Sequence, residues 1–495
     1  MKSESGGSSH FEIDAEDLPD GWISCTFGDI ADVLAGGTPT ASDDTNFSDE
    51  GYPWITPADL SNFNSMYIQR GRRSLSEKGL KTSSAKMVPK GTVLMSSRAP
   101  IGYVAIAANP ISTNQGFKNF ICHEEVAPEY IYYWIKYLNP YLEGMGSGST
   151  FAEISGTRAK KIPIKYPPLA EQQRIVARVE ALLMHVNAAR ARLSRVPLIM
   201  KKFRQGVLTA ACSGRLTEGW REENPSDVRA DQIYEKIQNL RHEKFKSDCE
   251  SAIKLGLMKP RDQNKNKQSR NQVPDLPELP IEWKYYRLED ISYLITDGTH
   301  ITPKYQESGI PFLSVKNVRP FLIRDKDIKH ISQEEFNQIN QRCNPEREDI
   351  LYTKVGATYG YAAINRLDYS FSIFVSLALV KPVREYFSPE YAEIVMNSEI
   401  VFEQARDRIS GIGTPDLHLI EIRDFRIPFP PLAEQHEIVR RVGLLFERAD
   451  AFDREVVAAS RRCERLTQAV LGKAFRGDLV AELRFPMDGR IRRSK

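Results

Sequence analysis

The sequence predicts an α+β chain built as a pseudo-twofold tandem repeat. Two mixed α/β bodies are expected at opposite ends of an antiparallel coiled coil of two long helices. Three observations support this prediction. The residues PPLAEQ occur at 167–172 and again at 430–435. Apolar residues recur with a period near 3.5 after each copy, as they do in helices that pack along other helices. The stretches upstream of the two copies are far less alike than the copies themselves.

The length and composition indicate a globular protein of more than one domain. The 495 residues exceed one ordinary core, and 41% hydrophobic with 27% charged residues is typical of globular chains. A net charge of +3 means that a nucleic-acid role would require local basic patches. No apolar run suits a membrane span or a signal peptide, and the six cysteines have neither disulfide nor zinc spacing. We therefore expect a cytoplasmic protein without a membrane partner.

The repeat extends beyond PPLAEQ at a constant offset of 263 residues. Between 167–182 and 430–445, 11 of 16 positions are identical. QGVLTAACSGRL at 205–216 then aligns with QAVLGKAFRGDL at 468–479 without a gap. The tail that follows each body is therefore duplicated, and its two copies have remained similar in sequence.

The bodies themselves share only their borders and one weak pattern. LPDGW at 18–22 matches LPIEW at 279–283, which marks the start of each body. KGTVLMSSRAPIGYVAIA at 90–107 resembles REDILYTKVGATYGYAAI at 347–364, and both suggest a strand, a turn and a strand. We infer that the two bodies descend from one unit and have diverged.

Each tail is predicted to form a long helix with one apolar seam. Proline before the helix and Glu171 or Glu434 in its first turn favour a helix start. Two such helices of about 26 residues would span about 39 Å, close to one turn of DNA at about 34–36 Å. Pro197 is expected to break the first helix, and the alternative is that each seam only covers its own body. The seam positions are Ile175, Val179, Leu182, Val186 and Leu193 in the first tail and Ile438, Val442, Leu445, Phe452 and Val456 in the second.

With these features the chain resembles the specificity subunits of type I restriction–modification systems. The resemblance covers nearly the whole chain and rests on LPDGW, on LTEGWR at 216–221, on LTQAVLGKAFRGDL at 466–479, and on the two segments that run into PPLAEQ, GSTFAEISGTRAKKIPIKY and GTPDLHLIEIRDFRIPF. It implies a non-catalytic subunit whose two target-recognition domains each read one half of a bipartite, asymmetric DNA site. The helices would set the spacer and dock partner subunits.

The resemblance also implies partners, cofactors and segment borders. The partners would be double-stranded DNA, two methylation subunits and two restriction subunits. S-adenosylmethionine would belong to the methylation subunits and ATP with Mg to the restriction subunits, with no cofactor on this chain. The expected segments are a flexible arm (1–17), a first recognition domain (18–166), a first conserved helical region (167–217), a helix with a disordered linker (218–278), a second recognition domain (279–429), a second conserved helical region (430–481) and a basic tail (482–495).

Two other functions stay open as alternatives. One is a stand-alone nuclease of the PD-(D/E)xK type, because PDLPELPIEWK spaces Asp275, Glu282 and Lys284 suitably for such a site. That string straddles the linker and the LPxxW repeat, and the other copy has Gly21 and Ile23 at the matching places, which favours coincidence. The other alternative is a protein scaffold that does not bind DNA.

Candidate DNA contacts lie on the loops of the two bodies, where basic side chains suit phosphate or guanine and amides suit adenine. An exposed loop and an ordinary solvated face are the alternatives for Arg98 and for the basic run 67–86. The candidates of the first body are Thr56, Asp59, Arg70, Arg72, Arg73, Ser96, Ser97, Arg98, Asn114, Gln115 and Lys118. Those of the second body are His300, Lys304, Lys316, Asn317, Thr353, Lys354, Thr358 and Tyr359. Since the two sets differ, the two half-sites are expected to differ.

Overall fold

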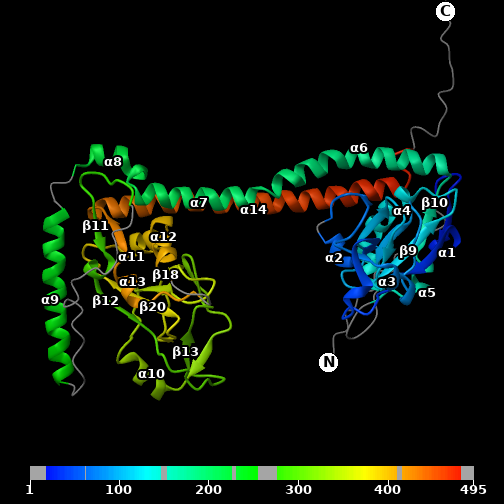
Figure 1. The fold of residues 1–495 in the computed structure, drawn as a ribbon. Helices are drawn as coiled ribbons and strands as arrows, with labels where there is room; N and C mark the ends of the chain where they lie inside the picture. The colour runs from blue at the N-terminus through cyan, green and yellow to red at the C-terminus, as the bar shows by residue number, and fades with distance from the viewer. Residues whose placement is uncertain are drawn as a thin grey trace, which may run out of the picture. The chain divides into compact units, whose positions relative to one another are not determined.

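The chain forms two compact units, shown in a computed structural model that describes residues 18–61, 63–145, 153–225, 230–254, 276–409 and 415–480 (Figure 1). Unit 1 comprises the residues up to Ser194 and from Val456 onward, and unit 2 comprises Arg195 to Glu455. Both units combine sheets with helices, which confirms the mixed α/β prediction for both bodies. Because the borders fall inside the tails, each unit joins the body of one copy to a helix segment from the tail of the other.

The body of unit 1 contains a five-stranded sheet in the order β2-β9-β6-β7-β4 and a three-stranded sheet in the order β5-β3-β8. β1 pairs antiparallel with β10, so the segments by which the chain enters and leaves this body lie side by side as a two-stranded ribbon. The strands are β1 (Ile23–Thr26), β2 (Ala31–Ala35), β3 (Phe47–Ile55), β4 (Tyr67–Ile68), β5 (Arg73–Leu75), β6 (Val93–Ser96), β7 (Val104–Ala107), β8 (Ser112–Thr113), β9 (Phe117–Cys122) and β10 (Pro163–Tyr166). The helices are α1 (Phe27–Ile30), η2 (Asp44–Asn46), α2 (Pro57–Leu60), α3 (Glu77–Thr82), α4 (Pro128–Met145), α5 (Gly156–Lys160) and α6 (Leu169–Leu193).

The body of unit 2 contains a four-stranded sheet in the order β12-β20-β17-β18 and a three-stranded sheet in the order β16-β13-β19. β11 pairs with β21 as its entry and exit ribbon, and β14 pairs with β15. The strands are β11 (Lys284–Arg287), β12 (Ser292–Asp297), β13 (Ile310–Leu313), β14 (Val318–Arg319), β15 (Leu322–Ile323), β16 (Lys329–Ile331), β17 (Ile350–Thr353), β18 (Ala362–Ile364), β19 (Ser372–Ile373), β20 (Leu377–Pro382) and β21 (Arg426–Phe429). The helices are α7 (Val196–Cys212), η3 (Arg215–Thr217), α8 (Glu218–Glu223), α9 (Ala230–Lys254), η5 (Leu288–Ile291), α10 (Gln333–Asn340), α11 (Pro389–Met396), α12 (Glu399–Arg408), α13 (Leu419–Arg423) and α14 (Leu432–Phe475).

The two bodies share one topology despite their divergent sequences. β2, β9, β6 and β7 correspond in order to β12, β20, β17 and β18, and β5-β3-β8 corresponds to β16-β13-β19. In both small sheets the middle strand pairs antiparallel with one neighbour and parallel with the other. The weak pattern shared by 90–107 and 347–364 predicted part of this correspondence, because it spans β6–β7 in one body and β17–β18 in the other.

The glutamine of each PPLAEQ ties the start of its helix to its own body. The side-chain oxygen of Gln172 accepts the backbone N–H of Ala127 at 2.9 Å, and that of Gln435 accepts the backbone N–H of Ser388 at 2.9 Å. Each amide nitrogen also donates to two backbone carbonyl groups. Since both side chains are fully buried, these hydrogen bonds fix the direction in which the helix leaves the body.

Three separate sequence markers of unit 2 meet at one buried carboxylate, that of Glu434. Its side chain is 2% exposed and accepts hydrogen bonds from Thr217 Oγ1 at 2.7 Å, from Arg221 Nε at 3.0 Å and from Trp283 Nε1 at 2.8 Å. Thr217 and Arg221 come from LTEGWR, and Trp283 comes from LPIEW. The three sequence markers are therefore parts of one structural joint in unit 2.

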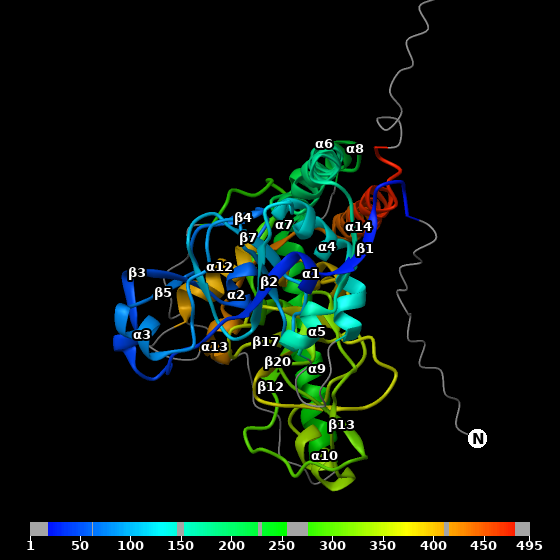
Figure 2. The same ribbon diagram turned by 90° about the vertical axis from the view of Figure 1, so that its right-hand side faces the viewer.

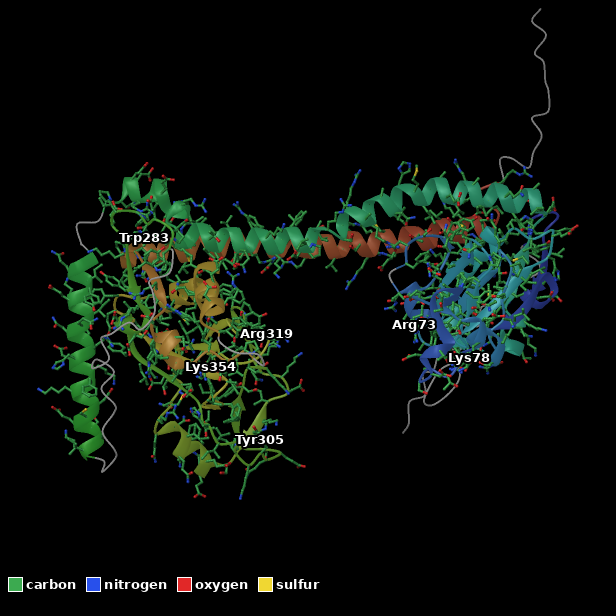
Figure 3. All side chains as sticks on the ribbon, viewed as in Figure 1. Arg73, Lys78, Trp283, Tyr305, Arg319 and Lys354 are labelled. Atoms are coloured by element: carbon green, nitrogen blue, oxygen red, sulfur yellow. The ribbon has the colours of Figure 1, made fainter. Side chains whose placement is uncertain are left out.

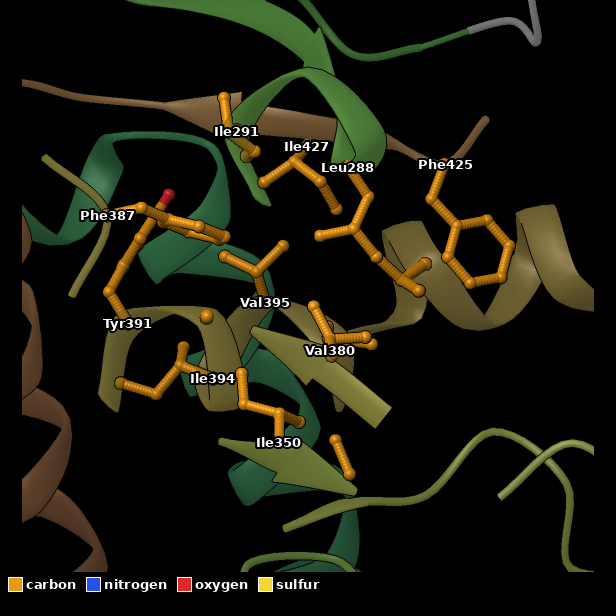
Figure 4. Packing of buried hydrophobic residues seen from close by; sticks show 14 of the residues in the cluster. Leu288, Ile291, Ile350, Val380, Phe387, Tyr391, Ile394, Val395, Phe425 and Ile427 are labelled. Atoms are coloured by element: carbon orange, nitrogen blue, oxygen red, sulfur yellow. The ribbon is translucent and has the colours of Figure 1, made fainter. Parts of the chain in front are cut away.

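Each unit has an apolar core that includes tail helices. In unit 2, the residues in Figure 4 from β17, β20, β21, η5 and α11 pack in the same cluster as Ile438 and Val442 of α14 and Val207 of α7. In unit 1, Phe475 near the end of α14 packs edge-on against Trp134 of α4, with ring centroids 4.7 Å apart. In Figures 1 and 2, α4 is seen beside this end of α14.

The seam of α6 departs from the predicted spacing. Ile175 and Val179 are buried in the core of unit 1, but the next buried residue is Leu183, and Leu182 is only partly buried. Packing against the body follows the rows of residues four apart on the helix surface, instead of the period of 3.5 of a two-helix seam. The alternative that the seam covers its own body thus describes this part of α6. Val186 and Leu193 are partly buried.

The seam of α14 combines both modes of packing. Ile438, Val442 and Leu445 join the core of unit 2 together with residues of α7, and Val456 is partly buried. Phe452 is 51% exposed, so the prediction for that position is wrong. Asp453 and Asp450 instead bind Arg204 of α7, which places a polar contact in that turn.

The helices also show where the two tails differ. α6 ends at Leu193, and α7 restarts at Val196 with Pro197 in its first turn, whereas α14 runs without a break. This confirms the predicted break of the first helix.

The segment 218–278, predicted as a helix with a linker, contains α8 and α9, and α9 ends at Lys254. Residues 255–275 of this segment, the predicted arm at 1–17 and the predicted tail at 482–495 lie outside the described residues.

Candidate nucleic-acid interface

Arg72 of the first body is an exposed cation oriented by a buried acid. Thr56 and Asp59 form the capping box of α2, and Asp59 also accepts hydrogen bonds from the backbone N–H and the Nε of Arg72, both at 3.1 Å. Burial alone would raise the pKa of Asp59, but the hydrogen bonds from Thr56 and Arg72 bring that pKa below its ordinary value. The side chain of Arg72 is 72% exposed and that of Asp59 is 6% exposed. Thr56 and Asp59 thus serve to present Arg72.

Two neighbouring arginines of the first body, Arg70 and Arg73, also have one side of the guanidinium group in contact with the protein. Arg70 donates to the carbonyl oxygen of Asp49 at 2.7 Å, and the guanidinium of Arg73 lies 3.4 Å from the ring centroid of Phe47. All three predicted arginines are exposed. Arg73 and Lys78 are labelled on the same part of the first body in Figure 3. These contacts limit the motion of each arginine while leaving it accessible, which suits contacts to phosphate.

The turn after β6 carries two predicted contacts that the structure places inside the body. Ser96 and Ser97 are fully buried, and Ser96 Oγ donates to the carbonyl oxygen of Pro100 at 2.7 Å and accepts the N–H of Tyr103 at 2.9 Å. The predicted strand, turn and strand at 90–107 put both serines on the turn, but Ser96 is the last residue of β6 and the bend lies further on, at Ala99 and Pro100. We therefore correct the prediction: these serines shape the turn and do not face DNA.

Arg98, Lys118 and Glu153 form one cluster at the exit of this body. Glu153 accepts a hydrogen bond from Arg98 Nε at 2.9 Å and lies 3.4 Å from Lys118 Nζ. The Lys118 side chain is 5% exposed and the Arg98 side chain 43%. Lys118 is thus a buried residue, contrary to the prediction of a DNA contact, whereas Arg98 remains an accessible candidate. Its terminal nitrogens could form a bidentate contact with guanine.

The predicted amides of the first body have different environments. Asn114 is half-buried, and its side-chain oxygen accepts the N–H of Gly116 at 2.9 Å. This contact closes the turn before β9. Gln115 at the tip of the turn is exposed, so it remains a candidate for contact with a base.

In the second body, only Lys316 of the pair after β13 is exposed. Asn317 is 5% exposed, and its side-chain oxygen accepts the N–H of Ser314 at 3.0 Å. We correct the prediction for Asn317, which closes a turn through this hydrogen bond. Asn317 and Asp59 both lie on the turn that follows the middle strand of their small sheet, β13 or β3.

The turn after β17 repeats the turn after β6. Thr353 is fully buried, donates to the carbonyl oxygen of Thr358 at 2.6 Å and accepts the N–H of Tyr361 at 2.8 Å. Thr358 and Tyr359 are half-buried, and Tyr359 stacks on Phe402 with ring centroids 5.4 Å apart. Thr353 is therefore a structural residue, in contrast to its prediction as a DNA contact.

Lys354 directly after β17 is also buried, and its partner Asp297 lines a hollow of about 360 Å³ together with His300 and Arg342. Lys354 Nζ lies 3.7 Å from Asp297 and 3.7 Å from Asp416. Asp297 also contacts Arg342 and, at 3.4 Å, His300. Figure 3 labels Lys354 within the second body. We therefore correct the prediction of a DNA contact for Lys354, which, like Lys118, is buried and forms ion pairs within its own body.

His300, which lines this hollow, and Lys304 are both exposed. Lys304 donates its backbone N–H to Glu335 at 2.9 Å, which leaves its side chain accessible. In both bodies the accessible predicted cations thus surround turns whose inner residues are polar and buried. Such an arrangement can contact phosphate and base edges.

The described residues contain no group of three or more His, Cys, Asp or Glu placed to hold a metal ion. Of the three nuclease candidates, Asp275 lies outside the described residues, and Lys284 is paired opposite Phe429 in the entry ribbon. Within the described part of the chain, no helix is long and apolar enough to cross a membrane.

Comparison with known proteins gives the family. A family model for the type I restriction modification DNA specificity domain matches twice, at residues 19–193 and 280–449. The chain belongs to this family. Each match covers one body with the start of its tail, so the chain contains two DNA specificity domains, as the tandem repeat predicted.

Curated relatives match over almost the whole length of the chain. The type I restriction enzyme MjaIX specificity subunit of Methanocaldococcus jannaschii is 28% identical over 481 residues, with 95% of this chain and 96% of the relative covered. The EcoKI specificity subunit of Escherichia coli is 24% identical over 499 residues, with 95% and 92% covered. A solved chain from work on complex assembly and conformational transition of the type I R-M system has a TM-score of 0.61 at 18% identity, covering 93% of this chain and 99% of its own.

The acidic partners in the two specificity domains were missed by the sequence interpretation. Glu153 and Asp416 were not selected as site residues, although the offset of 263 that joins the tails also places them opposite each other. That offset was the available signal. Asp297 has no such signal, because it aligns with Ala35 when β12 is matched to β2 through their pairing with β20 and β9.

Proposed function

We propose that this chain is the non-catalytic DNA specificity subunit of a type I restriction–modification complex. Each specificity domain reads one half of a bipartite, asymmetric site. The observation that carries the proposal is the double occurrence of one DNA specificity domain on one strand order, with different accessible side chains around the matching turns. Two readers with the same scaffold but different side chains suit a target whose halves differ.

The chemistry is assigned to partner subunits. Two methylation subunits would bring S-adenosylmethionine, and two restriction subunits would bring ATP and Mg. The relatives' names, type I restriction enzyme specificity subunits, support a role within such a complex. The tail helices are proposed to set the spacer between half-sites and to dock the methylation subunits.

A domain exchange tests the proposal. Residues 20–160 are replaced with the matching body of the EcoKI relative, and methylated adenines are mapped on DNA from cells that also produce the partner subunits. We expect one half of the target to change while the other half stays. The matched control is the reciprocal exchange of residues 281–423, which should change only the other half. If either exchange changes both halves, the modular function is contradicted.

The spacer is tested separately with a heptad insertion. Seven residues are inserted into α14 between Arg454 and Glu455, and seven are inserted at the matching level of α7. If the helices set the spacing, the distance between half-sites in the methylated target increases, and the two half-sites keep their sequences. An unchanged spacer would contradict this part of the proposal.

A further inference from the structure

A carboxylate and a buried lysine meet at the same place in both specificity domains. In the first domain, Glu153 lies 3.4 Å from Lys118 Nζ, and in the second, Asp416 lies 3.7 Å from Lys354 Nζ. The two lysine side chains are 5% and 6% exposed. Desolvating an ammonium group is costly unless an acceptor compensates, so each carboxylate offsets part of the cost of burying the lysine beside it.

The backbone shows that the two acids occupy equivalent positions. The N–H of Ile154, the residue after Glu153, donates to the carbonyl oxygen of Ser97 at 2.8 Å. The N–H of Leu417, the residue after Asp416, donates to the carbonyl oxygen of Lys354 at 2.9 Å. Isolated β-bridges join Arg98 to Glu153 and Val355 to Asp416. Each acid therefore sits where the chain leaving the domain crosses the turn after β6 or β17.

The two lysines, by contrast, come from different strands. The strand registers place Lys118 of β9 opposite Met95, and Ala378 of β20 opposite Tyr352, so Lys118 corresponds to Ala378. The position of Lys354 corresponds to Ser97, whose Oγ lies 3.2 Å from Lys118 Nζ. The ammonium group thus has the same acidic partner in both domains but is supplied by neighbouring strands. The two domains therefore share the ion pair at this place, although the lysine comes from a different strand position in each.

The pair joins the turn to the exit segment at the level of the accessible candidates. In the first domain Glu153 also binds Arg98 through Nε, which holds the guanidinium and leaves its terminal nitrogens for a bidentate contact. In the second domain Asp297 provides a further acceptor for Lys354, and it also binds Arg342 and His300 at the neighbouring hollow. Loss of Glu153 would therefore release Arg98 and remove the acidic partner of Lys118, and loss of Asp416 would leave Lys354 with Asp297 as its acidic partner.

We propose that Glu153 and Asp416 are positioning residues for sequence discrimination, each holding the recognition turn of its own domain through a buried lysine. This inference rests on the proposed DNA specificity function. It assigns a separate role to each acid, so that weakening one pair affects one half-site only. A general stability role would instead reduce binding to both halves.

The first test compares Glu153→Gln with Asp416→Asn in the full-length chain. Each protein selects from a pool of random 40-base-pair duplexes, and the bound DNA is sequenced to measure enrichment of each half of the motif. Since one good bidentate contact to a base discriminates by about tenfold or more, we expect Glu153→Gln to lower enrichment of one half about tenfold and leave the other half unchanged. Asp416→Asn should give the opposite pattern. Glu447→Gln, at an exposed position of α14, is the matched control.

The second test moves the lysine to the strand position used by the other domain. Lys118→Ala should weaken enrichment of the same half as Glu153→Gln, and adding Ser97→Lys should restore it, because the new lysine starts from the position of Lys354. Thermal unfolding of all variants is recorded in parallel. A role limited to stability predicts a lower unfolding temperature with enrichment of both halves reduced alike.

The outcomes separate this inference from the function on which it rests. If the wild-type chain enriches no bipartite motif, the proposed function fails. If the wild type enriches one but Glu153→Gln and Asp416→Asn change neither half, or change both equally, the positioning role is overturned. The same holds if Ser97→Lys gives no recovery in the Lys118→Ala background while both variants remain folded.

Discussion

Glu434→Ala provides the sharpest test of the joint in unit 2. The substitution removes the acceptor of three side chains, of which Thr217 is fully buried, Trp283 is 3% exposed and the Arg221 side chain is 15% exposed. Breaking a buried ion pair by removing one partner costs about 3–5 kcal/mol, and this pair has two neutral donors in addition. We therefore expect unit 2 to lose about 3–5 kcal/mol of unfolding free energy.

Urea unfolding of the full chain measures this loss, with hydrogen exchange of peptides from unit 2 used to assign the transition, because a chain of two units need not unfold in one step. Glu434→Gln keeps an acceptor oxygen, so it should lose less, about 1–3 kcal/mol. Glu447→Ala is the control on the same helix, since that residue is exposed and should change stability by less than about 0.5 kcal/mol. If Glu434→Ala falls within about 1 kcal/mol of this control, the carboxylate does not hold the joint.

Three further predictions concern the core, the interface and the pH response. Phe475→Ala should destabilise unit 1 by about 3–5 kcal/mol, because it empties a fully buried site against Trp134. Urea unfolding combined with hydrogen exchange of peptides from unit 1 measures this loss. An effect confined to unit 2 would contradict the prediction. Arg72→Ala should weaken binding to all duplexes alike and reduce the salt slope of binding by about one, as titrations at several salt concentrations would show; loss on a single sequence would instead indicate a base contact. Hydrogen bonds from Arg440, opposed by burial and reinforced by Arg441, lower the pKa of Glu437 from 4.5 to about 2. A carboxyl group whose pKa is lowered in the folded state stabilises the fold at pH values above its ordinary pKa, so this contribution should fade as the pH falls from 4.5 towards 2. The unfolding midpoint of Glu437→Gln should lack that part of the pH dependence.

The tail helices illustrate how far periodicity predicts structure. The start of each helix, the break at Pro197 and the burial of Ile175, Val179, Ile438 and Val442 follow from local chemistry and from the spacing of apolar residues. The errors at Leu182 and Phe452 arise where the partner changes. A helix that packs against a body and a helix that packs against another helix bury slightly different faces, and the sequence pattern does not state which partner is present.

The candidate interface divides in a similar way. The sequence correctly identified the turns after β6 and β17 as matching features, because they share one pattern of strand, turn and strand in both bodies. It did not separate inward from outward side chains on those turns. Ser96, Thr353 and Asn317 have the small polar side chains that suit DNA contacts, but the same side chains also close turns through hydrogen bonds to the backbone.

By itself, therefore, the sequence determined the duplication, the family and the start of each body, since all of these are repeated along the chain. Only the tertiary structure decided that Lys118 and Lys354 supply one equivalent ammonium group, because that depends on the register of strands far apart in the sequence. It also decided that each body is completed by a helix from the other tail. Burial and pairing between distant segments depend on how the chain closes on itself, which no local pattern of residues records.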